Sequence, residues 1–211
     1  MAALLTGGKT AATAAAPRAL TAQAPMSTSA QYSAPVTAPA PATPPAPTYK
    51  IGDKGPAGGI VFYDKGNNSG GWRYLEAAPV TTERTAAITF SNWQAVEGNR
   101  KVGDGKENTN KFIVVFKREG GGINSAAWLC NELTVSGFND WYLPSLDELL
   151  YMYNNLYLQG LADLKSANYW SSSVMYVYVY FLDFSDGSEK SINAAWSPPN
   201  ERYQVRAIRR F

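Results

Sequence analysis

The composition of this 211-residue chain changes abruptly at residue 48, and the change confines the folded part to residues 49–211. Residues 1–48 consist mostly of alanine, threonine, proline and serine. Such a segment buries too little apolar surface to offset the entropy lost on ordering, so we interpret it as a disordered tether. The remainder, roughly 160 residues, is long enough to bury a hydrophobic core. We therefore expect one folded domain behind a tether.

The start of the tether contains a pattern typical of bacterial lipoproteins. Residues 5–8 (LTGG) are similar to a lipobox in which glycine stands at the position of the lipidated cysteine. Neither a charged n-region nor a full apolar h-region precedes them, so they are not a working signal peptide as written. We expect a lipoprotein shortened ahead of its lipobox and made soluble by loss of the cysteine, so that membrane association needs an anchor not present in this sequence. The alternative is a chance match in an alanine-rich start.

The absence of histidine and the presence of a single cysteine, Cys130, limit the available chemistry. Without histidine the commonest general base and metal ligand is missing, and no Ser–His–Asp triad can form. One cysteine allows neither an internal disulfide nor a Cys/His zinc site. Cys130 follows the apolar residues 126–129, which favours a buried, inert thiol. The net charge of +2, without a dense Lys/Arg block, does not indicate nucleic-acid binding. We predict no cofactor and no metal.

Hydrophobic patterning predicts a mixed α+β domain. Strands are predicted at residues 59–64, 72–78, 169–173, 176–184 and 203–210, with the first two forming a hairpin. Helices are predicted at residues 110–117 and 125–133, joined by the glycines 120–122. The simplest arrangement places the helices in the middle of the chain and forms one antiparallel sheet from both ends.

A third helix has a defined start. Ser145 and Glu148 have the spacing of a capping box, in which the serine caps the helix and the glutamate is its third residue. An apolar face at helical spacing follows, made of Leu146, Leu149, Leu150 and Tyr153.

Patterns that support catalysis or phosphate binding are weak. The glycines of residues 52–59 precede a strand, whereas a phosphate-binding loop opens a helix, so turns are favoured. Carboxylate pairs exist at residues 147–148 and at Asp183 and Asp186, but acids at a helix start usually serve its dipole and loop acids are usually solvated. Asn139 and Asp140 lack the further oxygen ligands that calcium requires.

A set of motifs follows in order along the folded part. They are residues 55–64 (GPAGGIVFYD), 71–79 (GWRYLEAAP), 140–149 (DWYLPSLDEL), 169–173 (YWSSS), 184–187 (FSDG) and 205–211 (VRAIRRF). This set resembles bacterial formylglycine-generating-enzyme-like domains of C-type lectin fold and, among them, the variable proteins of diversity-generating retroelements. The resemblance covers residues 49–211 and implies an α+β C-type lectin fold. It carries no activity across, because the enzymes of related fold need two cysteines. The Glu-Pro-Asn and Gln-Pro-Asp triplets of calcium-dependent lectins are also missing.

In such variable proteins, error-prone copying at template adenines alters asparagine codons near the 3′ end of the gene and diversifies one ligand-binding face. The resemblance implies a variable region at about residues 170–205. The implied ligand-binding positions are Tyr176, Tyr178, Tyr180, Asp183, Asp186, Ser188, Ser191, Asn193, Ala194, Ala195 and Trp196, with Val174 and Met175 left open. The implied fixed scaffold comprises Trp141, Leu143, Pro144, Trp170, Ser171, Ser172, Gly187 and Arg206.

Residues 174–200 are rich in tyrosine, serine and asparagine without a helical period, which is typical of an adaptable binding face. We expect Trp196 at the surface and the other five tryptophans, Trp72, Trp93, Trp128, Trp141 and Trp170, in or near the core. The resemblance implies a monomeric lipoprotein of the bacterial outer surface that binds a protein or cell-surface ligand and is not an enzyme. The alternatives are an unvaried envelope domain and a small enzyme in which Asp183, Asp186 or Glu189 has a raised pKa.

Overall fold

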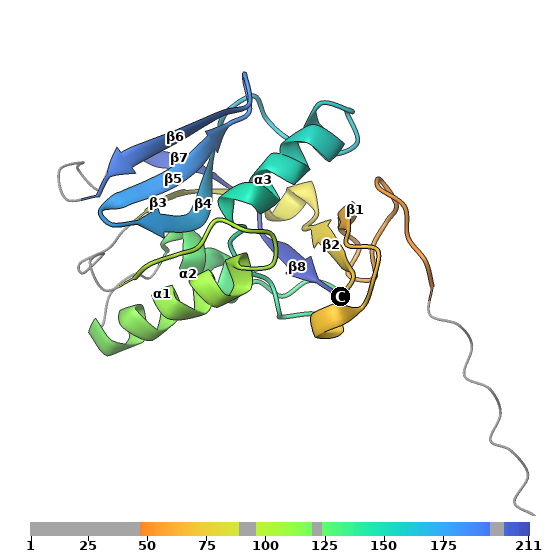
Figure 1. The fold of residues 1–211 in the computed structure, drawn as a ribbon, viewed down its shortest axis with the longest axis horizontal. Helices are drawn as coiled ribbons and strands as arrows, with labels where there is room; N and C mark the ends of the chain where they lie inside the picture. Colours follow the sequence, from red (N-terminus) through yellow and green to blue (C-terminus); the bar gives the residue numbers. More distant parts are fainter. Residues whose placement is uncertain (1–46, 89–95, 120–123, 195–200) are drawn as a thin grey trace, which may run out of the picture. The chain divides into compact units, whose positions relative to one another are not determined.

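The computed structural model describes residues 47–88, 96–119, 124–194 and 201–211. A compact unit runs from Ala46 to Phe211. Its described part contains three α-helices and two β-sheets (Figure 1), so the predicted mixed α+β class is confirmed. The interpretation of residues 1–48 as a tether lies almost wholly outside the described residues.

The smaller sheet joins the two ends of the domain. It has the order β1-β2-β8 and consists of β1 (Ile60–Asp64), β2 (Tyr74–Ala77) and β8 (Ile208–Arg210), all antiparallel. The predicted hairpin is thereby confirmed. Gly59, just before β1, lies so close to the carbonyl of Ala77 that a Cβ would collide with it.

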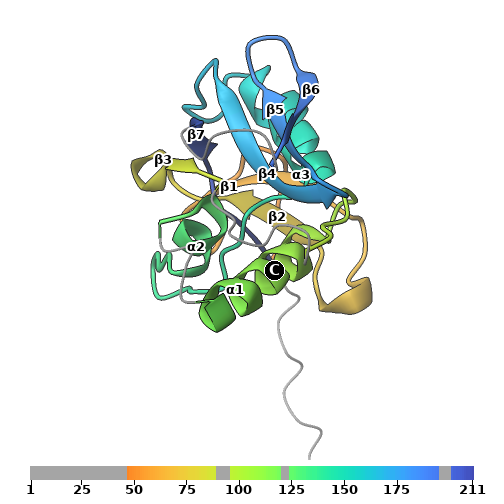
Figure 2. The same cartoon turned by 90° about the vertical axis from the view of Figure 1, so that its left-hand side faces the viewer.

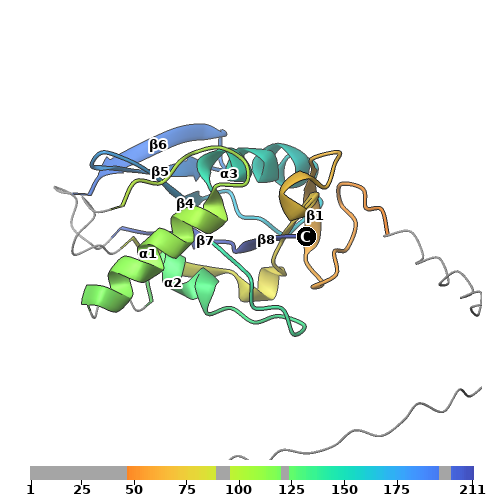
Figure 3. The same cartoon turned by 60° about the horizontal axis from the view of Figure 1, so that its bottom comes forward.

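The larger sheet has the order β3-β7-β4-β5-β6. Its strands are β3 (Arg84–Ala87), β7 (Arg202–Val205), β4 (Asn168–Met175), β5 (Tyr178–Asp183) and β6 (Ser188–Asn193). β4, β5 and β6 form a meander of consecutive antiparallel strands (Figure 2). Figures 1 and 3 show β6 at the outer edge of this sheet, with α1 and α2 on the side of the molecule away from it.

Two strand predictions need correction. The expected single run at residues 203–210 is divided between the two sheets, because Arg206 and Ala207 leave the ladder. Arg206 is buried and directs its guanidinium to Glu83, and the carbonyl of Ala207 accepts a hydrogen bond from Ala78. The expected single sheet is therefore two sheets. β3 and β6 have no counterpart among the predicted strands, because their short and largely polar sequences show no alternation.

The helices are α1 (Gly105–Glu119), α2 (Ala126–Asn131) and α3 (Leu146–Met152), and a π-helical turn (Tyr153–Tyr157) extends α3. Short 3-10 turns lie at Ser69–Gly71 and Val80–Thr82. The predicted capping box is confirmed, since Ser145 and Glu148 exchange side-chain to backbone hydrogen bonds. α1 begins earlier than predicted, at Gly105, where a Cβ would collide with the Glu148 carboxylate.

Two hydrophobic clusters form the core. The first, around Trp170, Phe112 and Trp141, joins α1 and α2 to the larger sheet. The second, around Leu149 and Phe184, joins α3 to both sheets. The tryptophan predictions hold for Trp72, Trp141 and Trp170, which are buried, and Trp128 is half-buried against the core, whereas Trp93 and Trp196 lie outside the described residues. Cys130 is buried as predicted, and this burial raises the pKa of its thiol, which makes it unreactive.

Candidate functional site

The strands β4, β5 and β6 place several of the predicted ligand-binding residues on one side of the sheet. Tyr178 pairs with Asn193 and Tyr180 pairs with Ser191 across β5 and β6. Directly opposed residues of an antiparallel pair share a face, and Met175 of β4 joins it because it pairs with Tyr178. We call Met175, Tyr176, Tyr178, Tyr180, Ser191 and Asn193 the tyrosine face, with Tyr176 in the adjoining turn.

The apolar members of the tyrosine face are unusually accessible. The exposed fractions are 75% for Tyr176, 52% for Met175 and 43% for Tyr178, while Tyr180 is half-buried. Tyr176 has a φ of 55°, a left-handed conformation that non-glycine residues seldom adopt. The alternate side chains of β5, at Val179 and Phe181, are buried in the core. A large apolar surface is thus displayed on a strand whose other side is packed.

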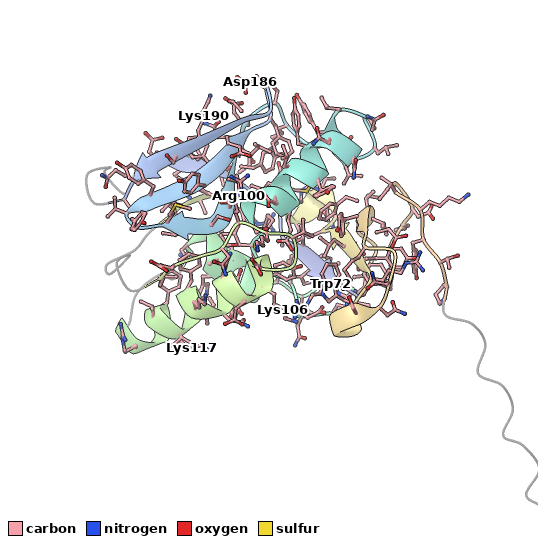
Figure 4. The ribbon with its side chains drawn as sticks, in the orientation of Figure 1. Trp72, Arg100, Lys106, Lys117, Asp186 and Lys190 are labelled. Carbon is pink, nitrogen blue, oxygen red and sulfur yellow. The ribbon has the colours of Figure 1, made fainter. Side chains whose placement is uncertain are left out.

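A groove of about 590 Å³ lies beside the tyrosine face. One wall consists of Met175, Tyr176 and Tyr180, and Leu146 and Ser173 contribute to its lining. The opposite wall is formed by residues of the segment 97–104, which we call the wall segment. Figure 4 shows Arg100 of this segment next to the larger sheet, and Asp186 at the far tip of the β5–β6 hairpin.

The backbone of the wall segment is fixed at nearly every residue. Gly98 and Val174 exchange backbone hydrogen bonds, which attach the segment to the end of β4. The next carbonyls, those of Asn99, Arg100 and Lys101, accept hydrogen bonds from Asn108 Nδ2 (2.7 Å), Asp147 N (3.0 Å) and Ser145 Oγ (2.9 Å). The wall segment is therefore bound to α1 and to the start of α3, and it is a rigid surface.

Glu148 holds the far end of the wall segment from inside the protein. Its side chain is fully buried and accepts hydrogen bonds from the N–H groups of Gly103 (2.9 Å) and Ser145 (2.7 Å) and from the hydroxyl of Tyr142 (3.3 Å). Burial raises the pKa of Glu148 from 4.5 to about 7, although these hydrogen bonds favour the ionised form. The capping box predicted from sequence thus also positions the groove.

Buried serines fix β4, the base of the tyrosine face. Ser171 Oγ donates a hydrogen bond to the carbonyl of Tyr180 at 2.7 Å, which ties β4 to β5 where their register shifts. The N–H of Ser172 donates to the carbonyl of Pro144 at 2.7 Å. These contacts fix the backbone of β4 from inside the protein.

Ser173 links β4 to both sides of the groove. Its Oγ donates to the carbonyl of Asn99 at 3.0 Å and accepts from the N–H of Leu146 at 2.9 Å. One hydroxyl thereby joins the wall segment, the start of α3 and the strand that carries the tyrosine face. Ser173 was not among the scaffold residues expected from the sequence, although it belongs to the same serine run.

Arg100 makes the ion pairs nearest to the groove. Its Nη2 and Nη1 donate to the two carboxylate oxygens of Glu189 at 2.7 and 3.1 Å, and its Nε donates to Asp147 Oδ1 at 2.8 Å. The hydrogen bonds to Glu189, and after them the one to Asp147, raise the pKa of Arg100 above its usual value. Arg100 is thus shared between β6 and α3.

The remaining predicted positions lie elsewhere. Asp183, Asp186 and Ser188 surround the β5–β6 turn, away from the groove. The Lys190 ammonium, 2.6 Å from Asp183, and hydrogen bonds from Ser185 lower the pKa of Asp183 to about 2. Hydrogen bonds from Ser188 lower the pKa of Asp186. These carboxylates stabilise the turn.

The end of the predicted variable region is only partly described. The N–H of Ala194 donates to the carbonyl of Val177 at 2.8 Å, so Ala194 continues the β5–β6 ladder, and its side chain is half-buried. Ala195 and Trp196 lie outside the described residues.

No pattern in the sequence indicated the wall segment. Its residues have no hydrophobic period, and their link to the tyrosine face is made by contacts between distant parts of the chain. The only local signal is the Gly-Asp-Gly turn at residues 103–105, which precedes α1.

The described ranges contain no group of three or more histidine, cysteine, aspartate or glutamate side chains placed to hold a metal ion. Within the same ranges, no helix is long and apolar enough to cross a membrane.

Comparison with known proteins adds no family. No protein-family model and no curated protein matches the chain. The function is therefore inferred from the chemistry of the tyrosine face and the groove.

Proposed function

We propose that this protein binds macromolecular ligands through the tyrosine face and the adjoining groove. One observation carries the proposal: Met175, Tyr176 and Tyr178 are exposed, yet they lie on two strands and the turn between them, and buried serines hold the first of these strands. Exposed apolar side chains gathered at one place usually mark an interaction site.

The physical properties of this surface suit recognition of another macromolecule. Tyrosine brings a large contact area and a polar hydroxyl at a small cost in rotamer entropy. Each well-packed aromatic contact contributes about 1–2 kcal/mol, provided that little ordering is needed on binding. The wall segment and β4 meet that condition, because hydrogen bonds to α1, α3 and β5 fix both.

The nature of the scaffold and its diversification form part of the same proposal. The ordered motifs of residues 55–211 support a C-type lectin fold and a variable protein of a diversity-generating retroelement. The lipobox-like residues 5–8 support display on the bacterial surface through a lipid anchor in the native form. Sequencing the flanking genome tests diversification. An imperfect repeat of the 3′ end that differs only at template adenines, beside a reverse transcriptase gene, is expected, and a genome without one would reduce the chain to an unvaried domain.

The carboxylate-enzyme alternative receives less support. It requires an acid with a raised pKa in a cleft, but the pKa values of Asp183 and Asp186 are both lowered by their partners. A purely structural envelope domain is also less favoured, since it gives no reason to expose Tyr176 and Tyr178. A binding role accounts for the exposure of the two tyrosines and requires no acid with a raised pKa.

Binders selected from a displayed protein library against the immobilised chain provide the direct test. Tyr176→Ala and Tyr178→Ala are expected to weaken most selected binders at least tenfold, a loss of about 1.4 kcal/mol, while the unfolding midpoint stays nearly unchanged. Tyr151→Ala is the matched control, because Tyr151 is 41% exposed but lies on α3 outside the tyrosine face. Binders that respond to Tyr151→Ala and ignore the other two variants would contradict the proposal.

A further inference from the structure

The guanidinium of Arg100 connects three segments that are far apart in the sequence. It belongs to the wall segment and contacts both carboxylate oxygens of Glu189 on β6 and one oxygen of Asp147 at the start of α3. All three side chains are partly accessible, with exposed fractions of 45%, 38% and 28%. A planar guanidinium that donates hydrogen bonds to two carboxylates fixes the position of each relative to the other. The ammonium group of a lysine would not impose this geometry.

β6 has little else to hold it on this side. It is the edge strand of the larger sheet, and within the described residues it pairs with β5 alone. Its other described ion pair, between Lys190 and Asp183, also leads to β5. On the opposite side of the strand, Ile192 packs against the core. Among the described residues, the Arg100–Glu189 pair is thus the ionic link between β6 and the wall segment.

We propose that Arg100 is the positioning residue that sets the distance between β6 and the wall segment. Glu189 shares the side of the sheet occupied by Tyr180 and Ser191, since it pairs with Leu182 on the same ladder. When Arg100 holds Glu189, the tyrosine face and the groove form one continuous rigid surface. Release of the pair leaves the outer strand of that surface attached through β5 and Ile192 alone.

Separation of β6 from β5 can be followed at individual backbone amides. The N–H of Ala194 donates to Val177, so alternation along the ladder directs the N–H groups of Ile192 and Lys190 towards β5 as well. Hydrogen exchange at these two amides reports how often β6 separates from the sheet. An exposed ion pair contributes little to global stability, so its loss alters this local opening rather than the unfolding midpoint.

Hydrogen exchange of the full chain, followed by mass spectrometry, tests the role of Arg100 without a ligand. Arg100→Gln and Glu189→Gln are each expected to speed exchange in β6 by about two- to fivefold, and 1 M salt should do the same to the unmodified protein. The double variant is expected to match the single variants, because both remove the same link. Arg100→Lys should restore part of the protection. Exchange at residues 168–174 of β4 should stay unchanged.

Lys101→Gln is the matched control, because Lys101 is the neighbouring exposed base and has no ion pair in the part of the chain that the structure describes. Equal exchange in the Arg100→Gln and Lys101→Gln proteins would overturn the proposal, as would additive effects in the double variant. The consequence for ligand affinity rests on the proposed function. Selected binders should lose affinity with Arg100→Gln and regain part of it with Arg100→Lys. A failure to find binders would leave the exchange result intact.

Discussion

The buried carboxylate of Glu148 accepts a hydrogen bond from the N–H of Gly103 at 2.9 Å across a separation of 45 residues. The contact places an ionisable group behind the wall segment, where water does not reach it. The geometry of the groove is therefore connected to the protonation state of a residue that no ligand touches.

Stability is expected to fall as the pH rises from 5 to 8. The pKa of Glu148 is about 7 in the folded protein and near 4.5 when unfolded, so the folded state binds an extra proton between these values. The stabilising effect is complete below pH 4.5 and is lost as the pH rises through 7, with a magnitude of about 3 kcal/mol. Urea unfolding at pH 5 and pH 8 measures it.

The variant Glu148→Gln isolates this effect, because it cannot titrate and its stability should vary much less over the same range. The lowered pKa of Asp183, about 2, affects stability only at lower pH, where protonation removes its favourable pairing. An equal pH dependence in the variant and the unmodified protein would assign the effect to another group.

Tyr176 is expected to store backbone strain. Its φ of 55° favours glycine, so Tyr176→Gly should be more stable than Tyr176→Ala by about 1 kcal/mol. Both variants remove the same exposed ring, which makes their difference a measure of the backbone alone. Urea denaturation of the two proteins side by side gives this difference, and equal values would show that position 176 relaxes in solution.

Trp170 is expected to be a major determinant of stability. Its Nε1 donates a hydrogen bond to the carbonyl of Ala86 at 2.8 Å, and the centroids of its ring and of the Tyr203 ring are 4.3 Å apart. Trp170→Phe removes the hydrogen bond and leaves a cavity, so we expect a loss of about 2–4 kcal/mol. Thermal unfolding measures the loss. Tyr178→Ala, at the exposed face, should cost less than about 1 kcal/mol, and a similar cost for both would mean that Tyr178 is part of the core.

The buried pair of Arg206 and Glu83 gives a further prediction. Their charged atoms are 2.7 Å apart and the side chains are only 2% and 3% exposed. Glu83→Gln leaves the guanidinium without a counter-charge and should cost about 3–5 kcal/mol. Replacing both, as Glu83→Gln with Arg206→Met, should recover part of that loss. Chemical unfolding of the single and double variants measures the coupling, and simple additivity would argue against the pair.

Local interactions explain which elements sequence analysis predicted well. The capping box of Ser145 and Glu148 acts within one helical turn, so the spacing alone was sufficient. The hairpin of β1 and β2 likewise depends on neighbouring residues and a glycine-rich turn. β6 was not predicted, because its sequence has no apolar alternation. Ile192 is its one apolar residue, and this side chain packs against the core.

The candidate site was only half predictable. The tyrosines at residues 178 and 180 alternate on one strand, so their common side follows from the sequence once β5 is known, whereas Tyr176 lies in the turn before it. The opposite wall does not, since Arg100 meets Glu189 across 89 residues and no local pattern records such a contact. Asp183 and Asp186 were grouped with the tyrosines by resemblance, while the structure places them at the β5–β6 turn.

Alternate side chains of β5 point to opposite sides of the larger sheet, so neighbouring residues have different roles. Val179 and Phe181 point into the core, and Tyr178 and Tyr180 leave the strand on the other side. A library randomised at position 178, which is exposed, should consequently contain many members with nearly the same melting temperature. Selection could then act on what the protein recognises without being limited by how well each member folds.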